Sequence, residues 1–154
     1  SKDQEFTLLQ AEVYGRQILK AEPAEGMIEG LKKARTNSKK FVLVSHKTKH
    51  PIKGPKYNLR NAAMEWLSMH GFFNQECIGM TEKDIYFENT IEEKVDRINQ
   101  ICCSYFIDDL PEVLTLVDKS IEKILYNPKR ENENKKKEGL IVMRNWKELN
   151  RIIK

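Results

Sequence analysis

At residues 104–112 the chain reads SYFIDDLPE, a short apolar run that ends in two adjacent acids, Asp108 and Asp109. The run is typical of a buried strand, and a helix-like pattern follows from about Pro111. A strand that ends in acids places their carboxylates at the carboxyl edge of a sheet, where open α/β folds bind ligands. Paired carboxylates suit a hard cation such as Mg²⁺. The alternative is a turn in which one of the two acids caps the next helix.

The composition is that of an ordinary globular domain. The chain has 154 residues, of which 40% are hydrophobic and 32% charged, enough for one domain with a real core. No apolar run approaches the ~20 residues that a membrane-spanning helix needs, and the three cysteines lack a metal-type spacing. We therefore expect reduced thiols, a cytoplasmic location and no membrane partner. The formal charge of +4 permits an anionic substrate but is too weak to indicate a nucleic-acid partner.

Helix-type and strand-type patterns alternate along the chain. Strands are expected at 41–44, 85–87, 105–107, 124–126 and 140–143, and helices at about 4–19, from Pro23, from Leu59 to Leu67, from a capping box at 90–93 to Ile101, from Pro111 to Leu116 and after Asn145. Such alternation predicts a single α/β domain over residues 1–154, with a mostly parallel sheet flanked by helices. The charged stretch 127–139 is expected to be a mobile loop.

Two further residues accompany the acid pair. Ser45 follows the expected strand 41–44, so its hydroxyl would also lie at a carboxyl edge, where it could bind a phosphate oxygen. The alternative is an ordinary loop serine. Lys94 lies in the first turn of its helix, where the helix dipole disfavours a cation by a few tenths to ~1 kcal/mol. A nearby anion would offset that cost, and the alternative is a solvated lysine.

The order of strand and Ser45, Lys94 at a helix start, and strand and acid pair resembles the haloacid dehalogenase (HAD) superfamily of Mg²⁺-dependent phosphotransferases. The closer resemblance is to a group of small bacterial HAD-like hydrolases. It rests on LQAEVYG (9–15), VSHKT (44–48), GPKYNL (54–59) and FIDDLPE (106–112). The resemblance implies a Rossmann-like three-layer sandwich that hydrolyses a small phosphorylated metabolite. It further implies that Ser45 and Lys94 bind phosphate and that Asp108 and Asp109 bind Mg²⁺.

The chain departs from the family pattern at its start. The superfamily's nucleophile lies in an Asp-x-Asp motif that closes the first strand, and no such motif precedes Phe41. We therefore expect an N-terminally incomplete domain, either a fragment or the product of a gene that has lost its catalytic start, and inactive alone. Residues 1–35 are then a helical segment that could be the remnant of a small cap.

The missing first strand would leave two strand edges unpaired. In the family's sheet that strand lies between the strand that ends at Ser45 and the strand that ends at the acid pair. Native proteins avoid such open edges inside a domain. We expect the two strands to pair with each other, to keep a gap, or to be bridged by another chain, and the protein to be oligomeric or marginally stable.

The loop from His46 to Lys56 is the best candidate for substrate recognition. It carries four lysines and two histidines, and His46, Lys47, Lys49 and Lys53 would favour a substrate with further anionic groups. The alternative is a basic, solvated loop.

Two functions remain open on these patterns. The first is a Mg²⁺-dependent phosphatase, and the second is a non-catalytic relative that binds a phosphorylated ligand or a partner protein. A nucleic-acid binder would need a basic helix or an interleaved aromatic stripe, which the sequence lacks.

Overall fold

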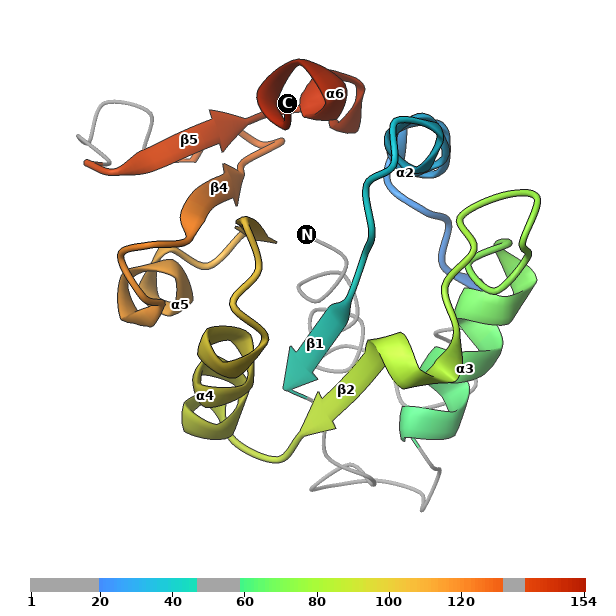
Figure 1. The fold of residues 1–154 in the computed structure, drawn as a ribbon, viewed down its shortest axis with the longest axis horizontal. Helices are drawn as coiled ribbons and strands as arrows, with labels where there is room; N and C mark the ends of the chain where they lie inside the picture. The colour runs from blue at the N-terminus through green and yellow to red at the C-terminus, as the bar shows by residue number, and fades with distance from the viewer. Residues whose placement is uncertain (1–19, 47–58, 132–137) are drawn as a thin grey trace.

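The computed structural model describes residues 20–46, 59–131 and 138–154. These residues form a mixed α/β structure with parallel strands in two small open sheets (Figure 1). The first sheet contains β1 (Leu43–His46) and β2 (Ile85–Glu88), and the second contains β3 (Tyr105–Asp108), β4 (Glu122–Tyr126) and β5 (Leu140–Met143). The helices are α2 (Met27–Thr36), α3 (Leu59–Met69), α4 (Ile91–Ile101), α5 (Pro111–Leu116) and α6 (Leu149–Ile152), with short 3₁₀ turns η2 (Glu82–Asp84) and η3 (Trp146–Glu148).

Strand pairing is parallel in both sheets. In the first sheet Ser45 of β1 aligns with Phe87 of β2. In the second sheet Asp108 of β3 aligns with Leu125 of β4. Strand β4 in turn pairs with β5. Helix α3 connects β1 to β2, and α5 connects β3 to β4, as parallel neighbours require a crossover. The predicted parallel arrangement is confirmed within each sheet.

Helices cover both faces of the strands. Leu43 of β1 packs in the larger hydrophobic cluster, with α2, α3 and α6, whereas Val44 packs in a smaller cluster with α4. The same alternation holds in β3, where Tyr105 and Ile107 contact the larger cluster and Phe106 contacts the smaller one. Because β1 and β3 share both clusters, corresponding faces of the two sheets lie under the same helical layers (Figure 1).

Helix α2 begins four residues later than the sequence predicts. The expected start is Pro23, whereas the helix begins at Met27. Gly26 directly before it has a left-handed conformation with φ of 78°, which interrupts a helix from Pro23 and which glycine adopts without steric cost. Residue 20 is the first that the structure describes, so the helix expected at 4–19 lies outside the described residues.

The helical segment expected at 1–35 contributes to the main core through its second half. Met27 and Ala34 are fully buried and Leu31 is 2% exposed, all within the larger hydrophobic cluster. Residues 27–36 therefore belong to the layer that covers the sheets.

Strand β1 is displaced by two residues from the prediction at 41–44. Its pairing with β2 begins only at Leu43, opposite Ile85, because β2 starts there, directly after η2. Ser45 therefore lies within the strand and not behind it, one residue before the strand ends at His46. The side chain keeps its predicted place near the carboxyl end of the strand.

The charged stretch 127–139 begins with an ordered turn. The N–H of Asn127 donates to the carbonyl of Met143 at 2.8 Å, and the buried side chain exchanges two hydrogen bonds with the backbone of Glu131. Residues 132–137 of the expected mobile loop lie outside the described residues.

Thr90 caps the start of α4, as the sequence predicts. Its Oγ1 accepts a hydrogen bond from the N–H of Glu93 at 3.0 Å. We expect Thr90→Ala to lower the free energy of unfolding by about 1 kcal/mol, because the N–H loses its acceptor. Thr36→Ala is the matched control, since that hydroxyl donates only to the Lys33 carbonyl at an exposed helix end, and it should cost less than ~0.5 kcal/mol. Urea denaturation measures both variants, and equal losses would contradict a capping role.

Candidate functional site

Lys94 and Asp108 form a buried ion pair. Asp108 is the last residue of β3, and Lys94 lies in the first turn of α4. The Lys94 Nζ lies 2.9 Å from the Asp108 Oδ2, and the two side chains are only 6% and 1% exposed. The carboxylate of Asp108 is thus the anion that offsets the unfavourable position of a lysine at a helix start.

This ion pair joins the carboxyl ends of the two sheets. Helix α4 follows β2 and contacts both β1 and β2, so Lys94 lies at the carboxyl end of the first sheet. Asp108 ends β3 in the second sheet. Contact between Lys94 and Asp108 therefore places the carboxyl ends of both sheets at one common edge of the molecule. Ser45 lies near the carboxyl end of β1 and so belongs to the same edge.

The hydroxyl of Ser45 is buried at this edge. The residue is fully buried, and its Oγ has no hydrogen bond among the described residues. A buried polar group in that state costs about 1–3 kcal/mol, so its presence in a native site calls for an explanation. No hydrogen bond joins Ser45 to Lys94 or Asp108 in the described part of the chain, so it contributes to the edge as a separate donor.

Asp108 also shapes the turn that leads into α5. Its Oδ1 accepts the N–H of Leu110 at 2.9 Å, while Leu110 itself occupies the cap position of α5 without a side-chain cap. The alternative interpretation, in which an acid caps this helix, therefore does not hold for Asp108. Its two oxygens instead hold the strand end and the lysine in fixed positions.

Asp109 has an unusually high pKa. Burial raises the pKa of this carboxyl to about 7, and the adjacent Asp108 carboxylate contributes to the increase. Asp109 is thus about half protonated near neutral pH, and a bound cation would favour its charged form.

The acid pair has the donor set that a Mg²⁺ ion uses. No group of three or more His, Cys, Asp or Glu side chains that could hold a metal gathers in residues 20–46, 59–131 and 138–154. Mg²⁺ nevertheless often takes only one or two carboxylates and completes its coordination with water and phosphate oxygens. A carboxylate oxygen has two lone pairs, so Asp108 can bind an ion in addition to its two hydrogen-bond donors. The acid pair thus supplies carboxylate oxygens, which are the ligand type that Mg²⁺ prefers.

The pKa of Asp109 makes stability depend on pH. The folded pKa of about 7 exceeds the ordinary value of about 4. The neutral carboxyl therefore contributes its full stabilisation below about pH 4, and this contribution is lost as the pH rises through about 7. In EDTA we expect Asp109→Asn to raise the free energy of unfolding by ~1–2 kcal/mol at about pH 8, a figure that allows for solvent screening of this partly exposed side chain. At about pH 4 the substitution should change the free energy of unfolding little.

A matched control for this effect is Asp118→Asn. Hydrogen bonds from the N–H and hydroxyl of Ser120 lower the pKa of Asp118, so removal of this charge should act in the opposite direction at neutral pH. Urea denaturation across the pH range measures both variants. The same sign for the two substitutions would contradict the raised pKa of Asp109.

Only the first residue of the expected substrate loop is described. His46 ends β1 at the edge that carries the site and is partly exposed. Lys47, Lys49 and Lys53 lie outside the described residues, so their role remains a prediction.

Two cation–aromatic contacts at α4 were not expected from the sequence. The Lys94 Nζ lies 5.8 Å from the centre of the Phe106 ring. The Arg97 guanidinium lies 4.8 Å from the centre of the Tyr86 ring, and its Nε lies 2.9 Å from the Glu88 Oε1. Lys94 and Arg97 are three residues apart on a helix and thus share a face. The spacing of three residues was the sequence signal that could have indicated this shared face. The two contacts attach α4 to both sheets.

No family model, curated protein or solved structure matches this chain. None of the helices in the described residues combines the length and apolarity needed to cross a membrane. The residues at the common carboxyl edge are therefore the main indication of function.

Proposed function

We propose that this chain binds the phosphoryl group of a small phosphorylated metabolite together with Mg²⁺, as the phosphate-binding and metal-binding part of a HAD-type phosphatase. The observation that carries the proposal is the buried pair of Lys94 and Asp108 at the common carboxyl edge. The buried hydroxyl of Ser45, which has no partner among the described residues, lies on the same edge. The two parallel sheets with helices on both faces are compatible with the Rossmann-like fold that this function requires.

The proposed roles follow from the chemistry of each side chain. Lys94 offers charge-assisted hydrogen bonds to phosphoryl oxygens. Asp108 holds the ammonium group of Lys94 in a fixed position. Ser45 donates its hydroxyl proton to another phosphoryl oxygen and thereby gains an acceptor that none of the described residues provides. Asp108 and Asp109 hold Mg²⁺, which supplies neutralisation of the phosphoryl charge.

Hydrolysis requires a nucleophile in addition to these groups. The Asp-x-Asp motif that supplies it in the resembling family occurs nowhere in the 154 residues. We therefore propose phosphate binding for this chain alone and phosphatase activity only where the nucleophile is also present. The chain should show no turnover of p-nitrophenyl phosphate with Mg²⁺, because the remaining groups act together with the nucleophile.

Calorimetric titration with inorganic phosphate tests the proposed site. We expect binding in Mg²⁺, loss of binding in EDTA, and about tenfold weaker binding by Ser45→Ala, as a hydrogen bond to a charged group predicts. Ser120→Ala is the matched control, because that hydroxyl is bound to Asp118. Equal phosphate affinity of Ser45→Ala and the parent chain, or no binding with Mg²⁺, would refute the assignment.

A further inference from the structure

Arg60 lies at the carboxyl edge of the first sheet. It is the second residue of α3, and its Nη2 donates a hydrogen bond to the Oδ1 of Asn89 at 2.7 Å. Asn89 comes directly after Glu88, the last residue of β2. The guanidinium carbon of Arg60 also lies 5.9 Å from the centre of the Phe87 ring. These two contacts hold the guanidinium group at the end of β2.

Arg60 and Ser45 belong to the same side of this edge. Phe87 is aligned with Ser45 in the first sheet, and neighbouring strands lie about 4.8 Å apart. Leu43 and Phe87 both pack in the larger hydrophobic cluster, which contains α3. Because side chains alternate along a strand, Ser45 lies on the same face as Leu43. The Ser45 hydroxyl is therefore on the α3 side of the sheet, whereas Lys94 comes from α4 on the other side (Figure 1).

The surroundings of Arg60 favour a bound anion. The first turn of α3 contains no acidic residue, and the positive end of the helix dipole lies there. The two contacts described above are to an uncharged amide and an uncharged ring, while Glu88 pairs with Arg97. A guanidinium group has five N–H donors in a planar fork, of which the bond to Asn89 uses one. This fork matches the geometry of a carboxylate or a phosphate.

We infer that Arg60 binds a second anionic group of the phosphorylated ligand. The ligand is then a metabolite that carries a carboxylate or another phosphate in addition to its phosphoryl group. The inference rests on the proposed function, in which Ser45 binds the phosphoryl group on the same side of the edge. The sequence predicts further anionic groups from the basic stretch that starts at His46. Arg60 is a residue with described contacts that sequence patterns did not indicate.

Calorimetric titration in excess Mg²⁺ with two matched pairs of ligands tests the inference. Glycerol 3-phosphate and 3-phosphoglycerate share a phosphoryl group and a carbon skeleton, but only the second has a carboxylate. Fructose 6-phosphate and fructose 1,6-bisphosphate differ by one phosphate. In at least one pair we expect about tenfold tighter binding of the ligand with the second anionic group, as a hydrogen bond to a charged group predicts. The pair that shows this preference identifies the group.

Two variants separate a specific role of Arg60 from the overall positive charge. Arg60→Gln should remove the preference within the pair. Lys123→Gln is the matched control and should keep it, because Lys123 lies near the amino end of β4 and donates to the carbonyls of Asp118 and Ile121. A preference that survives Arg60→Gln, or an equal loss of affinity for both members of the pair, would overturn the inference.

The titrations also distinguish failure of this inference from failure of the proposed function. Binding of glycerol 3-phosphate and fructose 6-phosphate without a preference in either pair would overturn the role of Arg60 and leave the phosphate site in place. Absence of binding by all four ligands and by inorganic phosphate would refute the phosphate site, and the inference with it.

Discussion

Lys94→Met should lower the free energy of unfolding by about 3–5 kcal/mol, because it leaves the carboxylate of Asp108 buried without its cation. The side chains of Lys94 and Asp108 are only 6% and 1% exposed, at an Nζ–Oδ2 distance of 2.9 Å. The pair also joins α4 to β3, so its loss removes a connection between the two sheets. Urea denaturation at neutral pH measures the effect.

Two further variants separate burial from charge. Lys147→Met removes an ion pair with Glu25 whose side chains are 67% and 77% exposed, and it should cost less than ~1 kcal/mol. The double variant Lys94→Met with Asp108→Asn removes both charges and should recover much of the loss, since no unpaired ion remains. An effect of Lys94→Met as small as that of Lys147→Met would show that the pair is not desolvated.

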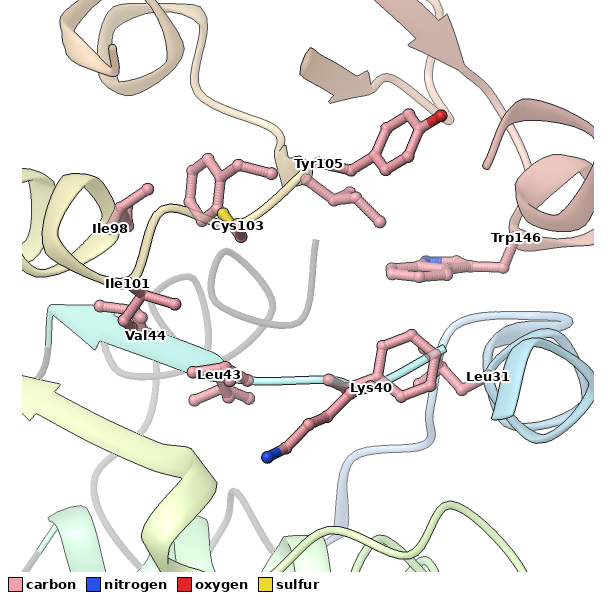
Figure 2. Close-up of a pocket in the computed structure, with 13 residues that line it drawn as sticks. Leu31, Lys40, Leu43, Val44, Ile98, Ile101, Cys103, Tyr105 and Trp146 are labelled. Carbon is pink, nitrogen blue, oxygen red and sulfur yellow. The ribbon is translucent and has the colours of Figure 1, made fainter. Parts of the chain in front are cut away.

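Trp146→Ala should cost about 3–5 kcal/mol, as truncation of a large core side chain leaves a cavity. Trp146 is 1% exposed and lies with its ring centre 5.7 Å from that of Tyr126, between the second sheet and the helices that cover it. It also lines a cavity between β1 and β3 (Figure 2), so its removal would enlarge an existing cavity.

Two substitutions serve as references for this result. Met69→Ala, at a side chain 61% exposed, should change stability by less than ~0.5 kcal/mol. Trp146→Phe should lose less than Trp146→Ala, because the indole N–H has no hydrogen-bond partner among the described residues and its removal breaks no bond. Thermal and urea denaturation should give the same order, and a Trp146→Ala variant as stable as Met69→Ala would contradict the packing.

Most secondary structure could be predicted from the sequence, because local patterns control it. The helix expected from Pro111 to Leu116 has those bounds, and the strand expected at 140–143 is β5. The Thr90 cap was predictable for the same reason, since the capping oxygen and its N–H are neighbours in sequence. Periodicity and capping depend on residues within a few positions of each other.

Boundaries that depend on distant partners were predicted less well. β1 was expected at 41–44 and lies two residues later, because pairing with β2 defines its start. Helix α2 was expected from Pro23, but it is delayed by the left-handed conformation of Gly26, which lies against Lys147 and Asn145 far along the chain. A strand exists only where a neighbour bonds to it, and the sequence of one strand does not contain the register of the other.

The site shows the same division. Strand-end and helix-start patterns indicated Ser45, Lys94 and the acid pair as individual candidates, and the family resemblance linked them. Their roles toward phosphate and Mg²⁺ remain proposals. The 2.9 Å contact of Lys94 with Asp108, the burial of Ser45 and the raised pKa of Asp109 come from packing, because desolvation depends on what surrounds a group.

Residue order and periodicity thus determine the alternation of helices and strands, the acids at a strand end and the lysine at a helix start. Only the tertiary structure leaves β1 and β3 in separate sheets among the described residues, with a cavity between them and the Lys94–Asp108 ion pair at the common carboxyl edge. The physical reason is the distance along the chain over which each kind of interaction acts. Local propensity acts over a turn of helix or a pair of residues, whereas strand pairing and burial depend on segments far apart in the chain.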